Sequence, residues 1–158
     1  MSRDTNTNTP LHFTLQEVVQ RSGLSEHTLR YYERIGLLDT VNRDSSSNHR
    51  RYTAEDVQKI ETLACLRTTG MSIDDMRKYF ALLKDGKAAA DQQLALFETQ
   101  KKALEQELAQ KQEHLRYLEQ KVAFWKAVQS GDDAKVSEIA EITAGLAKQL
   151  IKENKTDS

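Results

Sequence analysis

The sequence predicts a mainly α-helical protein, in which a winged helix-turn-helix domain is followed by a long coiled-coil helix and a short C-terminal helix. Three observations support this fold class. Two short helical patterns flank a glycine, and the second of them is rich in arginine and tyrosine. A segment with three arginines and a Ser/Asn-rich centre follows, which is typical of a β-hairpin wing. Apolar residues then recur at steps of three and four over more than four heptads.

These patterns divide the chain into four segments. Residues 1–11 are polar and contain the only proline, so we expect a disordered arm. Residues 12–86 carry the winged helix-turn-helix pattern of a DNA-binding domain, and residues 88–129 carry the pattern of a coiled-coil dimerisation helix. Residues 130–158 are expected to form a short C-terminal helix and a tail.

The first two helices have recognisable ends. Thr14 and Glu17 form a capping-box pattern at the start of a helix over residues 13–22, and Gly23 closes it. Ser25 can cap the second helix, which runs to about Ile35. A short helix, a glycine-containing turn and a second helix together indicate DNA binding.

The segment 39–52 changes character. Thr40-Val41 and Arg51-Tyr52 favour extended structure, while Asp44–Asn48 favours a turn, so we expect a hairpin wing. Two further helices should begin at Thr53 and Ser72 and end near Gly70 and Gly86.

The heptad pattern predicts a helix of about 40 residues, near 60 Å long, that cannot bury its apolar stripe on its own small domain. We therefore expect a partner helix from a second copy of the chain. The last helix, which Asp132 or Asp133 could cap, should turn inward Val136, Ile139, Thr143, Leu146 and Leu150. The stripe, called the seam below, consists of Leu94, Phe97, Lys101, Leu104, Leu108, Lys111, Leu115, Leu118, Val122 and Trp125.

The bulk composition excludes several classes of protein. The 158 residues carry 23 Lys+Arg and 24 Asp+Glu, so a positive field that faces DNA must be local. The single cysteine, Cys65, excludes an intramolecular disulfide framework and a multi-cysteine zinc site, and it fits a reducing compartment. No apolar run approaches the roughly 18 residues of a membrane span, and the N-terminus lacks an apolar signal core. We expect a cytoplasmic protein without a metal or cofactor.

The layout resembles the MerR family of bacterial transcription regulators over roughly residues 12–128. The resemblance rests on SEHTLRYYERIGLL in the second helix, on R-x6-R-R-Y-T in the wing and on LRTTGMSIDDMRKY after the third helix. It implies a homodimer joined by an antiparallel coiled coil. It also implies binding to a pseudo-palindromic promoter and distortion of the duplex, so that RNA polymerase can use that promoter when an effector is present.

The DNA-contacting residues are expected on the second helix, the wing and nearby helix ends. Arg30 can bridge phosphates or fork onto guanine, although it could instead pair with Glu26 or Glu33. The resemblance places Arg30 and Tyr31 on DNA, whereas Tyr32 is expected in the core. The full expected set is Thr14, Ser25, His27, Thr28, Arg30, Tyr31, Arg43, Arg50 and Arg67.

Several of these residues have a second interpretation. Thr14 could place its backbone N–H and hydroxyl on a phosphate, but its capping role needs no DNA. Arg43 and Arg50 flank the wing and are expected to clamp phosphates, while Arg51 could be a solvated side chain. The resemblance matches Arg67 to a basic residue that pins the distorted DNA; the alternative is an ordinary surface arginine.

Cys65 lies about 140° from the centre of the apolar stripe of its own helix and could face the coiled coil of a partner subunit. Its position in ACLRTTGMS resembles the lone cysteine of the thiol-dependent NmlR/AdhR branch of the family. That branch answers aldehydes, quinones or nitrosative and oxidative stress. None of the helical neighbours of Cys65 is basic, and Glu61 would oppose ionisation of the Cys65 thiol. The alternative is an inert cysteine that packs as a small apolar residue.

Other functions receive less support from the sequence. Residues 88–158 contain no cysteine and only His114, which argues against metal sensing. About 30 residues follow the coiled coil, too few for a separate ligand-binding fold. An effector would then act on the thiol of Cys65 or bind in a small pocket between the coiled coil and the last helix. The third alternative is that the protein has no effector. A coiled-coil adaptor that binds protein would leave the wing arginines without a purpose, and no catalytic motif indicates an enzyme.

Overall fold

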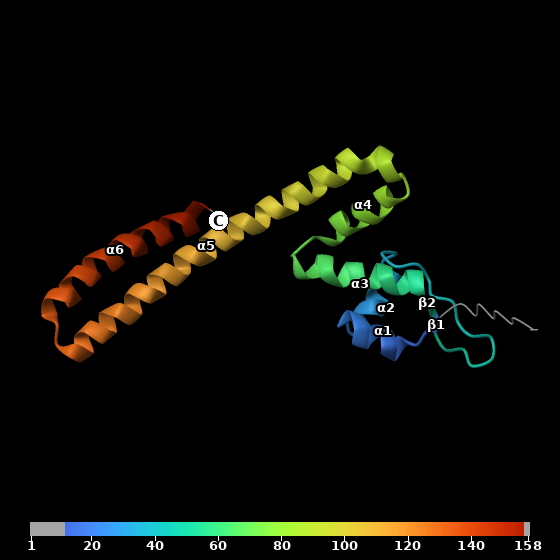
Figure 1. Ribbon diagram of the computed structural model, residues 1–158, viewed down its shortest axis with the longest axis horizontal. Helices are drawn as coiled ribbons and strands as arrows, with labels where there is room; N and C mark the ends of the chain where they lie inside the picture. Colours follow the sequence, from blue (N-terminus) through green and yellow to red (C-terminus); the bar gives the residue numbers. More distant parts are fainter. Residues whose placement is uncertain (1–11, 157–158) are drawn as a thin grey trace, which may run out of the picture. The chain divides into compact units, whose positions relative to one another are not determined.

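The computed structural model describes residues 12–156, so the expected arm over residues 1–11 lies outside the described part (Figure 1). The chain divides into two compact units, residues 1–100 and 101–158, and the division falls within one long helix. The elements are β1 (His12–Phe13), α1 (Leu15–Ser22), α2 (Glu26–Arg34), β2 (Tyr52–Thr53), α3 (Ala54–Thr68), α4 (Ile73–Leu83), the 3₁₀ helix η1 (Gly86–Ala89), α5 (Ala90–Ser130) and α6 (Asp133–Thr156).

The helices of the first unit begin where their caps predict. Thr14 Oγ1 accepts from the N–H of Glu17, and the Glu17 carboxylate accepts from the N–H of Thr14 at 2.7 Å, which completes a capping box. Gly23 ends α1 in the left-handed conformation, with φ of 69°. Thr53 caps α3 with a second capping box, and the hydroxyls of Ser25 and Ser72 cap α2 and α4 by accepting from the N–H three residues on.

One core holds α1 to α4 together. Val18 of α1, Leu29 of α2 and Leu63 of α3 are fully buried, and each such side chain contributes about 1.5–3 kcal/mol through the area removed from water. Tyr32 is 4% exposed, which confirms its predicted place in this core rather than on the surface. The remaining buried members are Leu24, Leu37, Leu38, Val41, Tyr52, Val57, Ile60, Met71 and Met76.

The start of α1 differs from the prediction. Phe13, expected in the helix, belongs instead to β1, which pairs antiparallel with β2 through His12↔Thr53 and Phe13↔Tyr52. A two-residue strand is too short to show an alternating pattern, so the sequence could not reveal it. The small sheet joins the start of α1 to the start of α3.

The wing is a short hairpin between α2 and β2. Arg43 and Arg50 form an isolated antiparallel bridge, and the N–H of Asp44 donates to the carbonyl of His49 at 2.8 Å. Asn48 turns the chain with a positive φ of 55°. The predicted hairpin is therefore present, but Thr40-Val41 lies outside its ladder, since Val41 instead packs into the core.

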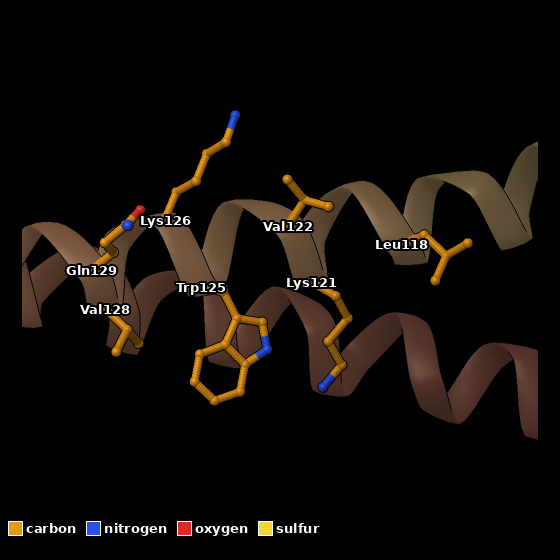
Figure 2. Close-up of a pocket in the computed structure, with 7 residues that line it drawn as sticks. All are labelled: Leu118, Lys121, Val122, Trp125, Lys126, Val128 and Gln129. Carbon is orange, nitrogen blue, oxygen red and sulfur yellow. The ribbon is translucent and has the colours of Figure 1, made fainter.

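The second unit is a helical hairpin of the C-terminal part of α5 and α6, which lie side by side (Figures 1 and 2). Gly131, with φ of 72°, makes the turn, and the Asp132 carboxylate caps α6 by accepting from the N–H of Lys135 at 3.1 Å. The inward residues of α6 are those predicted: Ile139, Thr143 and Leu146 are buried, and Val136 and Leu150 are half-buried.

The hairpin leaves the seam of α5 uncovered. On α5 the protected side chains include Tyr117, Phe124 and Ala127, which follow helical spacing and form one face. Seam residues lie on a different face, and Leu108 and Trp125 remain 58% and 65% exposed within the subunit. Within the described residues, we find no helix that is both long and apolar enough to span a bilayer.

Candidate nucleic-acid interface

The second helix of the helix-turn-helix presents one buried and one solvent-facing side. Leu29 and Tyr32 anchor it in the core, and Arg30 between them is exposed. Among the predicted DNA-contacting residues of this helix, His27 and Arg30 are exposed, while Thr28 and Tyr31 are half-buried. Ser25 is exposed as well, but its hydroxyl is engaged in capping the N–H of Thr28 at 3.1 Å.

A hollow between α1, α2 and the wing gathers four of the predicted residues: Thr14, Arg30, Arg43 and Arg50. We call it the wing-side hollow. Thr14 places the N-terminus of α1 at its edge, where free backbone N–H groups favour an anion. The lining of the hollow holds four arginines against one glutamate, although the whole chain has a formal charge of −1. Its other lining residues are Leu15, Gln16, Glu26, Asn48, His49 and Arg51.

A second hollow gathers four more predicted residues: His27, Thr28, Tyr31 and Arg67. We call it the α4-side hollow, because the start of α4 completes it. Its cationic group comes from the last turn of α3, and its floor is apolar. The remaining lining residues are Tyr32, Met71, Ile73 and Met76. The predicted set therefore forms two groups, both of which involve α2, and Ser25 belongs to neither.

Arg30 forms an ion pair with Glu26 one helical turn earlier, which is the alternative that the sequence left open. Both side chains remain largely exposed, at 62% and 48%. Exposed pairs of this kind contribute at most about 1 kcal/mol, so a phosphate could replace Glu26 at little cost. The DNA contact of Arg30 stays a prediction.

Arg50 makes a contact that sequence reasoning missed. Its Nη2 lies 3.1 Å from the Oε2 of Glu33, and the two side chains are only 17% and 13% exposed. The sequence suggests Glu33 only as a partner for Arg30. The pair joins the last turn of α2 to the wing across 17 positions of sequence, and no local pattern signals it. Arg51, by comparison, pairs within the wing with Asp44 at 3.5 Å.

Hydrogen bonds shift the pKa values of two carboxyl groups near the interface. At the wing tip, the hydroxyl of Ser46 and the N–H groups of Ser46 and Ser47 hold the pKa of Asp44 at about 2. At the start of α1, the N–H and hydroxyl of Thr14 lower the pKa of Glu17. Both carboxylates are therefore ionised at neutral pH and order the backbone beside the wing-side hollow.

The buried phenol of Tyr52 has a raised pKa, chiefly because burial disfavours its charged form and secondly because of the nearby Glu33 carboxylate. Tyr52 is fully buried in β2, directly after the wing. It therefore lies within the electrostatic field of the Glu33–Arg50 pair.

Cys65 is exposed on α3, consistent with its predicted position off the apolar stripe. Glu61, one turn earlier, is engaged with Arg21 of α1 at 2.9 Å. In the part of the chain that the structure describes, there is no group of three or more His, Cys, Asp or Glu side chains that could hold a metal ion.

Known proteins share both the sequence and the fold of this chain. A family model described as MerR HTH family regulatory protein matches residues 13–83. An uncharacterised HTH-type transcriptional regulator of Haemophilus influenzae is 33% identical over 130 residues, which cover 82% of this chain and 96% of that protein. The HTH-type transcriptional regulator AdhR of Bacillus subtilis is 40% identical over 72 residues, which cover 46% of this chain and 51% of AdhR.

A solved structure extends the likeness to three dimensions. It is a crystal structure of HiNmlR, described as a MerR family regulator lacking the sensor domain and bound to promoter DNA. The match has a TM-score of 0.66 at 33% identity and covers 82% of this chain and 96% of that one. These relatives are regulators of transcription, which are DNA-binding proteins and not enzymes.

Proposed function

The chain belongs to the MerR family of transcription regulators, and we propose that it binds promoter DNA with α2 in the major groove. The observation that carries this proposal is the wing-side hollow, where four arginines from α2 and the wing face the N-terminus of α1. Such a cluster in a chain of charge −1 fits the phosphate backbone of a duplex.

The two hollows supply contacts on both sides of α2. In the proposed complex, Thr14 and Arg43 clamp phosphates on the wing side, and Tyr31 and Arg67 reach the backbone on the other side. Ser25, His27, Thr28 and Arg30, near the start of α2, lie closest to the base edges. Arg50 also borders the wing-side hollow, and its role is developed below.

Titration of a duplex carrying the promoter next to the gene tests this proposal. The logarithm of the binding constant should fall linearly and steeply with the logarithm of salt concentration. Each phosphate that the protein contacts should add about −0.9 to the slope of this line. Binding that is absent at low ionic strength, or that ignores salt, would instead support an adaptor that recognises protein.

We propose that two copies bind together, because the seam is left exposed and continuous along α5. Figure 2 shows the last part of this surface, where Leu118, Val122 and Trp125 line a hollow formed by α5 residues alone. Within one subunit this hollow has no cover from α6. A homodimer with two identical DNA-binding units requires a pseudo-palindromic site.

The two seam lysines favour an antiparallel pairing. In a parallel pair with matched register, Lys101 would face the partner's Lys101 and Lys111 the partner's Lys111. In an antiparallel pair centred on the seam, Lys101 lies opposite the partner's Leu118 and Lys111 opposite the partner's Leu108. Each lysine then covers an apolar neighbour with its stem and keeps its ammonium group in water.

We further propose that the dimer distorts its promoter and so controls access of RNA polymerase. Contacts on both sides of α2 in each copy, together with a stiff helix between the two copies, would hold the duplex at two fixed points. Energy transfer between dyes at the two ends of the duplex tests this step. A change on binding supports distortion, and an unchanged signal contradicts it.

Finally, we propose that Cys65 senses electrophiles or oxidants. Its exposed position supports this role, as does the resemblance of ACLRTTGMS to the thiol-dependent branch of the family. Mass spectrometry of the intact protein after exposure to aldehydes, quinones and oxidants should show one adduct, which Cys65→Ser abolishes together with induction. Normal induction in Cys65→Ser would refute the sensor role of the thiol and indicate an effector of another kind.

A further inference from the structure

We propose that Glu33 is a positioning residue, which holds Arg50 and thereby fixes the wing beside α2 without contacting DNA itself. The inference rests on the proposed function, because it assigns a role within the same DNA-contacting surface. It concerns how that surface keeps its shape rather than which atoms contact the duplex.

The burial of the Glu33–Arg50 pair sets it apart from the ion pairs around it. Its side chains are 13% and 17% exposed, whereas those of the Arg30–Glu26 pair are 62% and 48% exposed. Solvent and salt screen a protected pair far less than an exposed one. Removing one member would leave an uncompensated charge in a site that water reaches poorly, and such a loss is more damaging than the loss of a surface pair.

The wing depends on this contact because it has few other ties to α2. Its ladder is a single bridge, Arg43↔Arg50, and a hairpin of that size is marginal by itself. The other two wing arginines bond within the wing: Arg43 donates to the carbonyl of Asn48 at 3.3 Å, and Arg51 pairs with Asp44. Arg50 alone of the three reaches α2 through an ion pair in the described structure.

Two atoms of the pair and one neighbouring hydroxyl are buried without a hydrogen-bond partner within residues 12–156, which makes the site sensitive to a change of charge. The second carboxylate oxygen of Glu33, the Nη1 of Arg50 and the hydroxyl of Tyr52 are buried and have no hydrogen-bond partner among the described residues. Buried polar atoms of this kind are costly, so the site tolerates a further loss poorly. The three residues come from α2, the wing and β2, so the site lies where these three segments meet.

This arrangement predicts a different role for Arg50 than for Arg43. One guanidinium nitrogen of Arg50 is paired with Glu33 and another is buried, so Arg50 mainly neutralises a protein carboxylate. Arg43 is exposed at the wing-side hollow and is free to face a phosphate. Loss of Arg50 should therefore weaken binding without changing the number of ions released, whereas loss of Arg43 should reduce that number by about one.

A spin label at the wing tip tests the inference without DNA. The label is attached through Ser45→Cys in a Cys65→Ser background, since Ser45 is exposed at the tip. Glu33→Gln and Arg50→Met should each increase the mobility of the label. Glu61→Gln removes the α3 carboxylate that pairs with Arg21 of α1, and it should leave the mobility of the label unchanged. Unchanged mobility in Glu33→Gln overturns the proposal.

Binding measurements in the same variants complete the test. Glu33→Gln should lower the affinity for the duplex about tenfold and keep the salt dependence of the wild type. The double variant Glu33→Gln/Arg50→Met should lose no more affinity than the single variant that binds more weakly. A shallower salt dependence in Arg50→Met would show a direct phosphate contact and refute the positioning role.

The two proposals fail in different ways. If the wild type binds no duplex while the label still responds to Glu33→Gln, only the proposed function fails. If Glu33→Gln loses its helical signal, Glu33→Asp replaces it, because it keeps the charge and shortens the reach. Greater label mobility in Glu33→Asp supports the proposal, and wild-type mobility overturns it.

Discussion

The two units of this protein treat their apolar residues in opposite ways. In the first unit, the apolar faces of α1 to α4 meet in one core, and side chains such as Leu29 and Leu63 are fully buried. In the second unit, α6 covers one face of α5, while seam residues such as Leu108 and Leu118 remain 58% exposed. The first unit therefore completes its core within one chain, whereas the second presents an apolar surface for another molecule.

The largest expected effect tests whether the seam is an interface between two copies of the chain. Leu108→Glu together with Leu115→Glu places two charges on the exposed face of α5 in each copy. We expect a monomer under conditions in which the wild type is a dimer, because four carboxylates would have to be buried in the dimer. Sedimentation measures the result. Gln106→Glu, outside the seam, is the control and should stay dimeric; a dimer that persists in the double variant would refute the seam.

The next test compares one leucine from each unit in that monomeric background. Leu29→Ala leaves a cavity in a closed core and should lower the free energy of unfolding by about 2–5 kcal/mol. Leu118→Ala removes a side chain that is already solvated in the monomer, so we expect a loss below about 1 kcal/mol. Denaturant titration gives both values. Equal losses would mean that the seam is buried within one subunit.

The smallest effect concerns the wing tip and sharpens the account of the first unit. The pKa of Asp44 is lowered from its ordinary value of 3.8 to about 2 in the folded wing. A lowered pKa means that the carboxylate stabilises the wing above pH 3.8 and that this contribution disappears as the pH falls through about 2. Carbon NMR of the Asp44 carboxyl should give a midpoint near the lower value.

A variant identifies the cause of that shift. Ser46→Ala removes the hydroxyl that donates to Asp44, which is the largest single cause, and should move the midpoint upward toward 3.8. A midpoint that does not move would mean that the wing-tip turn is held by other contacts.

Local features of the first unit could be predicted from the sequence because their causes lie within a few residues. Thr14, Ser25, Thr53 and Ser72 mark helix starts, since a cap needs only an oxygen three residues before a free N–H. The same holds for Tyr32, whose helical spacing from Leu29 assigns it to the core. The strand β1 escaped prediction because two residues carry no period.

The candidate site could be predicted only in part. The sequence indicated which residues belong to α2 and the wing, but not that the candidate residues line two separate hollows beside α2. It also suggested Arg50 as a phosphate ligand, while the fold gives that residue a carboxylate partner in Glu33. The DNA contacts themselves stay predictions.

The amino-acid sequence alone determined the helices, their caps and the two apolar stripes of the C-terminal hairpin, because periodicity and capping act over a single helical turn. Only the tertiary structure decided which face of α5 packs on α6, which arginine is buried against α2 and which strand pairs with β1. These pairings join residues many positions apart, so they depend on how the packed helices place distant side chains and not on any pattern within a short segment.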